Sequence, residues 1–369
     1  MEMPRPLRPL RLIALFAGTL WTGCGAAPKP VAKPVAAAPA AAPAPALEKQ
    51  RQTLRISPLE MAFSGVRGEP AGDEGVSVKN LTNDGLQVRT IRIVGENAAT
   101  FALTDVPTLP RYIAPDKSID FRVAFAPKAD ATVGVHRATL QIVLGPNDEL
   151  GPLVDISALV TVGKAGADEP PLQDVVHALG YLIDVGGQDL VLGTEAAAKG
   201  EELRAPLFRS IKPGNIALDP VARFSPDGAM PYGYYRADAA GKPQEKQLGV
   251  LAATESQRLN PGFEDGEGSI SFDPGTEPFG LYVGLPTHTT YTESARNPVR
   301  PAEKRKRAKK NAPPPFAGTV SHAVRVYPLR SRNGTRIDNA YLVAFEDAVN
   351  GDYQDAVFVL WNVVPVTAP

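Results

Sequence analysis

The densest group of chemically capable side chains lies near the C-terminal end of the chain, in the stretch FEDAVNGDYQD from 345 to 355. Calcium binds six to eight oxygen ligands, which carboxylates and the carbonyls of a bent loop can supply. Carboxylates held this close without a cation repel one another or take up protons. The stretch therefore predicts a calcium site, with a hydrogen-bonded or solvated turn as the alternative. The four carboxylates concerned are Glu346, Asp347, Asp352 and Asp355.

Strand periodicity limits which of these carboxylates can share one site. The flanking runs NAYLVAFED and DAVFVLW are apolar and typical of strands. Asn350 and Gly351 let the chain reverse between the two runs. Neighbouring strand residues point to opposite faces, so Glu346 and Asp347 cannot both point inward unless the strand has ended. We favour Asp347, Asp352 and Asp355 as side-chain ligands and regard Glu346 as the less favoured candidate.

Catalysis has little support elsewhere in the sequence. The four histidines stand in no zinc-protease or nucleophile-elbow motif; they are His136, His177, His288 and His322. Glycoside hydrolysis needs only two carboxylates at a suitable separation, which Glu346 with Asp352 or Asp355 would supply. Few aromatic residues lie close in sequence to line a sugar pocket. The sequence therefore predicts a non-catalytic binding protein, with a glycoside hydrolase as the catalytic alternative.

A second acidic stretch, FEDGEG from 263 to 268, repeats the string Phe-Glu-Asp. It follows Asn260 and Pro261 and precedes a short strand-like run. We interpret it as a solvated loop, and a second cation site is the alternative.

A basic run, RPAEKRKRAKKNAPPP, occupies residues 300 to 315. It lacks apolar periodicity and ends in prolines, which predicts an exposed, disordered insertion over 298–315. The run is either a solvated stretch or a contact for anionic polysaccharide, lipid headgroups or extracellular nucleic acid. Aromatic residues do not interleave with the charges, so we expect no specific nucleic-acid recognition. The candidate contact residues are Lys304, Arg305, Lys306, Arg307, Lys309 and Lys310.

The elements that must position these groups read as short strands. Between 53 and 163, runs such as SIDFRVAFAP alternate apolar and polar residues and are separated by Gly, Pro, Asn and Asp. Such alternation indicates antiparallel sheets with one solvated face. A polar break at 163–171 is followed by LQDVVHALG, whose spacing predicts a short helix that Gly180 ends. More strand-like runs follow. We therefore predict an all-β protein with two antiparallel β-sandwich domains, at 53–163 and 170–369, and one short helix opening the second.

The N-terminal region predicts export and an anchor. Three arginines and a short apolar run precede Cys24, the only cysteine, which is typical of a secretory signal over 1–23. Alternating Pro and Ala cannot build a core, so 24–52 predicts a disordered, extended stalk. The residues Thr22-Gly23-Cys24 resemble the lipobox of bacterial lipoproteins. That resemblance implies lipidation of Cys24, and Gly25 after it favours the outer membrane, on its periplasmic or surface-exposed face.

Two further resemblances concern the folded parts. The stretches VSVKNLTNDGLQVRTIRIVGENAATFAL and IAPDKSIDFRVAFAPKADATVGVHRATLQI resemble Hydin-type (ASH) immunoglobulin-like domains, also seen in bacterial choice-of-anchor D surface proteins. This resemblance implies a scaffold or binding role and no activity. Near the end of the chain, Phe345-Glu346-Asp347 and Gly351-Asp352-Tyr353 with Asp355 resemble a domain family of unknown function in secreted bacterial proteins.

Together these features predict a calcium-stabilised lipoprotein of the cell envelope that acts as a structural or adhesive module. Its expected partners are the membrane, through the lipid anchor, and a polysaccharide or protein of the cell surface or matrix. A carbohydrate-binding module of an envelope assembly remains open as the second reading.

Overall fold

The computed structural model describes residues 53–69, 71–163, 168–188, 198–212, 216–266, 268, 270–284, 288–297, 322–346 and 351–366. The predicted leader and stalk, Cys24, the basic run at 300–315 and Asp347 lie outside these residues. The described part consists mainly of β-strands with a short α-helix, which confirms the all-β prediction. No helix within it is long and apolar enough to cross a membrane.

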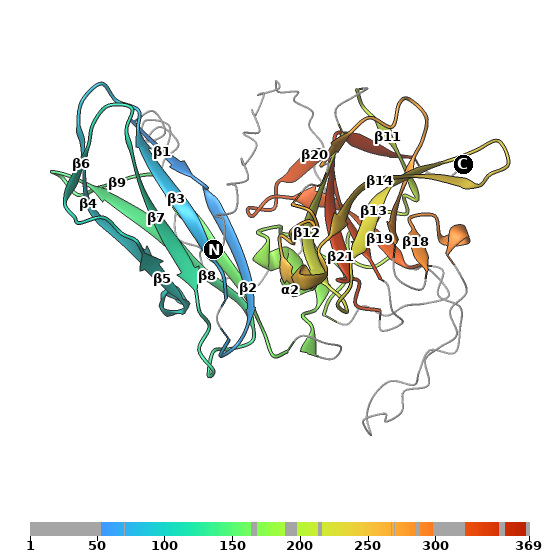
Figure 1. The fold of residues 1–369 in the computed structure, drawn as a ribbon, viewed down its shortest axis with the longest axis horizontal. Helices are drawn as coiled ribbons and strands as arrows, with labels where there is room; N and C mark the ends of the chain where they lie inside the picture. Colours follow the sequence, from blue (N-terminus) through green and yellow to red (C-terminus); the bar gives the residue numbers. More distant parts are fainter. Residues whose placement is uncertain are drawn as a thin grey trace, which may run out of the picture.

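The first part of the fold is a sandwich of two sheets (Figure 1). One sheet has the order β1 (Leu54–Ser57), β3 (Asp73–Asn80), β7 (Ser118–Phe125) and β5 (Phe101–Thr104). The other has the order β2 (Glu60–Val66), β10 (Val154–Thr161), β8 (Gly134–Leu144), β4 (Leu86–Val94) and β6 (Arg111–Ile113), and β9 (Glu149–Leu150) pairs with β8. The order β1-β3-β7-β5 corresponds to the ABED sheet of an immunoglobulin domain and β10-β8-β4 to its GFC sheet, while β2 and β6 extend the second sheet at its edges.

Alternating burial explains why these strands form one core. In β7 every second residue is buried, ending with Val123 and Phe125, while the residues between them are more exposed. One pairing departs from the antiparallel prediction, because β2 runs parallel to β10. The chain breaks its strand at Ser57 and Pro58 and crosses from the first sheet to the second without reversing. It therefore runs alongside the last strand in the same direction.

The second part also contains two facing sheets. The larger has the order β15 (Gln257–Leu259), β12 (Ile216–Phe224), β21 (Ala356–Trp361), β20 (Arg336–Phe345) and β19 (Val324–Arg330), and β16 (Ser271–Phe272) also pairs with β12. The smaller has the order β14 (Pro243–Leu251), β13 (Met230–Ala237), β17 (Gly280–Gly284) and β18 (Thr289–Tyr291). A separate pair joins β11 (Leu207–Ser210) to β22 (Val363–Val366). The 3-10 turns are η1 (Ala98–Thr100), η3 (Ala253–Glu255) and η4 (Ser294–Arg296).

The larger sheet of the second part is buried on both faces. Val343 and Phe358 face the smaller sheet and share its core. Leu342 and Val357 face the opposite way, toward α2 (Leu172–Ala178) and toward Leu159 of the first sandwich. Burial on both faces explains why β20 and β21 read as nearly unbroken apolar runs.

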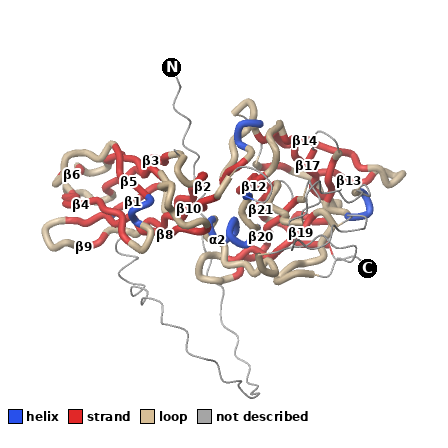
Figure 2. The backbone as a smooth tube through the Cα atoms, turned by 90° about the horizontal axis from the view of Figure 1, so that it is seen from below, coloured by secondary structure: helices blue, strands red, loops and turns tan. Residues whose placement is uncertain are grey.

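The helix predicted at the start of the second part is present as α2, which lies at the junction of the two sandwiches (Figure 2). Its buried residues pack into the core that Leu159 also joins. Polar contacts cross the same junction: the Leu259 amide donates to Ser64 Oγ at 2.8 Å, and Arg332 Nη2 donates to Ser157 Oγ at 3.1 Å. The two sandwiches are therefore joined by shared packing as well as by the chain.

Candidate metal centre

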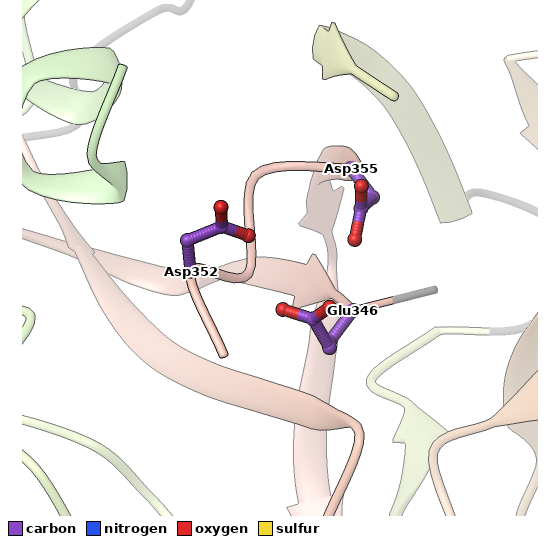
Figure 3. A group of neighbouring side chains, drawn as sticks. All are labelled: Glu346, Asp352 and Asp355. Carbon is purple, nitrogen blue, oxygen red and sulfur yellow. The ribbon is translucent and has the colours of Figure 1, made fainter. Parts of the chain in front are cut away.

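Three of the four predicted carboxylates converge at one corner of the larger sheet (Figure 3). One carboxylate oxygen each from Glu346, Asp352 and Asp355 lies within 4.8 Å of the other two. Asp347 lies outside the described residues. Glu346, which the sequence ranked behind the aspartates, therefore belongs to the group, and we call these three residues the acidic corner.

Strand register explains the meeting of Glu346 and Asp355. The last paired residues of β20 and β21 are Phe345 and Ala356. Glu346 and Asp355 occupy the next position of the same pair, so both point to the face that carries α2 and not to the face of Phe345. Both side chains are buried, and Asp352 in the connecting turn is half-buried.

Tyr353 shapes the turn that returns the chain to the corner. Its φ is +56°, a left-handed conformation uncommon for a residue with a bulky side chain, and Gly351 has a φ of +80°. The Tyr353 amide donates to Glu346 Oε2 at 3.0 Å, and its hydroxyl donates to the His322 carbonyl at 2.7 Å. Burial raises the pKa of Tyr353, so the phenol keeps its proton and remains a donor.

A buried ionic cluster, which sequence reasoning missed, lies beside Tyr353. The guanidinium carbon of Arg325 lies 4.5 Å from the centre of the Tyr353 ring. Arg325 also pairs with Glu202, whose other oxygen is 2.6 Å from His322 Nε2. Arg325 is only 2% exposed and Glu202 is buried as well. Glu202 is distant from the corner in the sequence, yet together with Arg325 and His322 it supports the turn through Tyr353.

Opposing influences set the ionisation of Glu202. Burial alone would raise the pKa of its carboxyl group. Hydrogen bonds from His322 and the Lys199 amide, together with the charge of Arg325, outweigh burial and hold that pKa below its usual 4.5. Glu202 is therefore ionised at neutral pH and balances the charge of Arg325.

The donor set of the corner suits a hard cation. Its side chains offer only carboxylate oxygens, which are ligands that calcium prefers. Next to Asp355, the side chain of Gln354 is fully buried. Neither its oxygen nor its nitrogen makes a hydrogen bond within the described residues, so both could contact a bound water or ion. An ordered water or an ion commonly satisfies a group of this kind. The residues present therefore fit a calcium ion.

The second Phe-Glu-Asp stretch has a different environment. Glu264 and Asp265 are exposed, and Glu264 Oε2 accepts a hydrogen bond from the Ala253 amide at 3.0 Å. In the described ranges, the acidic corner is the one group of three potential ligands that comes together. Glu267 of this stretch lies outside those ranges. The geometry there is that of a solvated loop.

Two other histidines, His136 and His177, have structural surroundings. His136 Nε2 lies 2.7 Å from the Thr132 carbonyl, and His177 Nε2 lies 3.0 Å from Gln173 Nε2 on α2. Burial lowers the pKa of His177, which agrees with a neutral ring that accepts from the Gln173 amide. The basic residues Lys304 to Lys310 lie outside the described residues.

No protein-family model and no curated protein matches the chain. Among solved structures, the ASH/PapD-like domain 7 of human CEP192 is 12% identical with a TM-score of 0.24, covering 34% of this chain and 94% of that domain. The E. coli chaperone DraB is also 12% identical, with a TM-score of 0.24 and coverages of 60% and 98%. A Porphyromonas gingivalis W83 protein of unknown function is 18% identical, with a TM-score of 0.22 and coverages of 29% and 46%. Likeness at these TM-scores supports no inference about function, and the immunoglobulin-like assignment rests on the strand order above.

Proposed function

We propose that this protein is a non-catalytic, calcium-stabilised binding module of the bacterial cell envelope, tethered by a lipid on Cys24. The observation that carries the proposal is the convergence of Glu346, Asp352 and Asp355 within 4.8 Å at the end of a buried sheet. Carboxylates this close repel one another, and a bound cation would offset that repulsion. Calcium at the corner would tie the end of β20 to the start of β21 and so hold the C-terminal strands together.

The burial of the corner favours binding over glycoside hydrolysis. Glu346 and Asp355 are almost fully buried, and Glu346 already accepts the Tyr353 amide. A glycosidase must present both carboxylates to a sugar ring in an accessible cleft. A structural cation needs no such access. The non-catalytic reading therefore agrees better with the geometry than the glycosidase alternative does.

The role in the envelope can be tested with cells. We expect deletion of the protein to reduce cell–cell or cell–surface cohesion in calcium-containing medium, and the unaltered chain to restore it. The Asp352→Asn/Asp355→Asn chain should restore it poorly, whereas Glu264→Gln/Asp265→Asn should restore it fully. Cohesion unaffected by deletion would contradict the adhesive role. Glycan binding without turnover would then favour the carbohydrate-binding module, and glycan cleavage would favour the hydrolase.

The tether makes a separate prediction. Cys24→Ser should release the protein from the membrane fraction, because the thiol is the site of lipid attachment in the family that Thr22-Gly23-Cys24 resembles. Retention equal to that of the unaltered chain would contradict lipidation. Alanine replacement of Cys24 is a matched second variant, since it also removes the thiol.

The basic run offers a contact with a polyanion. Binding to anionic polysaccharide or anionic lipid through Lys304, Arg305, Lys306, Arg307, Lys309 and Lys310 should weaken steeply as salt rises. Replacing these six residues with glutamine should abolish the salt-sensitive part of binding. If binding and its salt dependence stay the same, the run is only a solvated insertion.

A further inference from the structure

An open cavity of about 460 Å³ lies beside α2, and none of the three carboxylates of the acidic corner lines it. Its walls come from α2, the segment that follows α2, Glu201, and the hairpin between β19 and β20. Small-ligand sites usually have volumes of about 300–1,000 Å³, so the cavity is large enough for one. The lining side chains that a ligand could contact are Gln173, His177, Leu182, Asp184, Glu201 and Arg330.

Hydrogen bonds between these segments fix the walls of the cavity. Gln173 joins α2 to the next segment, because its amide nitrogen donates to the Ile183 carbonyl at 2.8 Å and its oxygen accepts the Val185 amide at 3.1 Å. The Glu201 amide donates to the Asp184 carbonyl at 2.8 Å. A ligand would therefore meet walls that are already ordered, and little conformational entropy would be lost on binding.

The rim of the cavity presents both acceptors and donors. Asp184 is exposed, and one of its carboxylate oxygens accepts the Gly186 amide at 2.8 Å. Glu201 pairs with Arg330 through one oxygen, and their side chains are 30% and 33% exposed. Within the described residues, the second oxygen of each carboxylate has no hydrogen-bond partner. The same holds for Nη2 of Arg330, which bonds through Nε and Nη1.

His177 adds another donor, and Leu182 supplies the apolar part of the lining. Burial lowers the pKa of His177, and its Nε2 accepts from the Gln173 amide, so the neutral ring keeps its proton on Nδ1. In the part of the chain that the structure describes, Nδ1 has no hydrogen-bond partner. Leu182 is 48% exposed and lies against Gly334 of the hairpin. The cavity thus combines free acceptors, free donors and an exposed apolar side chain.

We propose that this cavity binds a neutral sugar unit of a surface polysaccharide. A hydroxyl group is a donor and an acceptor at once. Neighbouring hydroxyls of one sugar can therefore satisfy the free oxygens of Asp184 and Glu201 together with Nη2 of Arg330. A cation would leave the donors without a partner, and an anion would be repelled by the two carboxylates. The C–H groups of the sugar ring can cover Leu182.

A protein partner fits the cavity less well. Protein interfaces depend on aromatic or arginine anchors in desolvated pockets. Among the lining residues, Leu182 is the one large apolar side chain that is exposed. A polysaccharide repeats its unit along the chain, so a weak contact at each cavity is strengthened when several copies of the protein bind it. The inference rests on the proposed function for its setting, and it selects polysaccharide from the two partner classes left open there.

Calorimetric titration of oligosaccharides into the full chain carrying Cys24→Ser tests the proposal without a lipid anchor. The neutral probes are cellohexaose, built of hexose, and chitohexaose, built of N-acetylhexosamine; a guluronate hexamer is the acidic comparison. We expect a neutral hexamer to bind with millimolar affinity and the acidic one not to bind. Leu182→Ser/Glu201→Gln should weaken binding at least about tenfold, because it removes a hydrogen bond to a charged group and an apolar contact.

The matched control is Leu153→Ser/Glu149→Gln, which replaces an exposed leucine and an exposed glutamate of the first sandwich and should leave binding unchanged. Leu182→Trp is a second variant whose expected effect is a gain. The larger apolar ring should tighten binding of the neutral hexamer, and its emission should change as sugar is added.

Failure of both neutral hexamers to bind the unaltered chain, or equal weakening in the two double variants, would overturn the proposal. Preferential binding of a lysine-rich peptide, lost in Leu182→Ser/Glu201→Gln, would overturn it in favour of a protein partner. The titration measures neither calcium binding nor membrane attachment. Its failure is therefore distinguishable from failure of the acidic corner or of the lipid anchor.

Discussion

The chain contains the string Phe-Glu-Asp twice, and the two copies have opposite environments. In the copy that begins at Phe345, the phenylalanine packs against Phe358 at a ring-centroid distance of 5.8 Å, and Glu346 is buried. In the copy that begins at Phe263, the phenylalanine is half-buried against Tyr232, and Glu264 is exposed. Identical local sequence therefore gives a buried charge in one place and a solvated one in the other.

The difference arises from the strands around each copy. Phe345 ends β20, which has β19 on one side and β21 on the other, and a layer containing α2 covers that sheet. Phe263 lies outside the named strands and forms an isolated bridge to Leu251, at the end of the edge strand β14. A carboxylate that follows a central strand is covered by its neighbours, whereas one beside an edge strand reaches water. Strand position, and not the tripeptide, decides whether the carboxylates need a partner.

The largest expected effect comes from removing the buried guanidinium of Arg325, which lies beside the turn that follows the buried copy. Arg325→Met leaves buried Glu202 without its guanidinium partner, which should lower the free energy of unfolding by about 3–5 kcal/mol. The matched variant near the exposed copy is Arg258→Met, whose side chain is 38% exposed and whose partner Glu255 also accepts the Gly262 amide, so the loss should be smaller. Urea unfolding measures both. Equal losses would remove the distinction between the two regions.

Tyr353→Phe tests how much the Tyr353 hydroxyl stabilises the turn that follows the buried copy. The variant removes the hydroxyl and leaves the buried His322 carbonyl without that donor, which should cost about 1–2 kcal/mol. Tyr291→Phe is the control, because its hydroxyl meets the exposed Glu245. Tyr291→Phe should lose distinctly less free energy of unfolding in the same urea titration. A larger loss in the control would show that the turn does not depend on Tyr353.

Acid should act on the buried cluster in one direction. The pKa of Glu202 is lower in the folded chain than its usual 4.5, so the unfolded chain binds its proton first as pH falls. Its contribution to stability is therefore complete above about pH 4.5 and is lost as pH falls through the lower, folded pKa. Unfolding free energies from pH 6 to pH 3 should fall more steeply for the unaltered chain than for Glu202→Gln. Parallel profiles would contradict the ionised state of Glu202.

The smallest effect belongs to the exposed copy. Glu264→Gln/Asp265→Asn changes two solvated side chains and should alter the free energy of unfolding by no more than about 0.5 kcal/mol, with or without calcium. Thermal unfolding in chelator and in calcium gives the comparison. A calcium-dependent shift that disappears in this variant would move the cation site from the acidic corner to the second stretch.

Much of the fold follows from local patterns. The alternation of apolar and polar residues predicted β7 and β8, and the 3.6 period predicted α2, with Gly180 at a φ of +81° after it. The parallel pairing of β2 with β10 had no local signal, because direction depends on the crossing from one sheet to the other. Local patterns therefore predict an element that depends on residues close in sequence, and they do not predict a pairing between distant segments.

The candidate site shows the same limit. Spacing was enough to single out Asp352 and Asp355, but the inward role of Glu346 depends on where the strand ends. Arg325 carried one usable signal, since a charge stood in the otherwise apolar run HAVRVYPL. Its partner Glu202 lies in an aperiodic segment 123 residues earlier, and only the folded structure brings them together.

Calorimetric titration of calcium into the chelator-treated chain, with thermal unfolding at matched calcium, tests the central claim most directly. A cation that binds only the folded state must raise the unfolding temperature. We predict binding heat and a raised temperature for the unaltered chain and for Glu264→Gln/Asp265→Asn, and loss of both in Asp352→Asn/Asp355→Asn. Absence of heat and shift in the unaltered chain, or their persistence in Asp352→Asn/Asp355→Asn, would contradict the acidic corner as a metal centre.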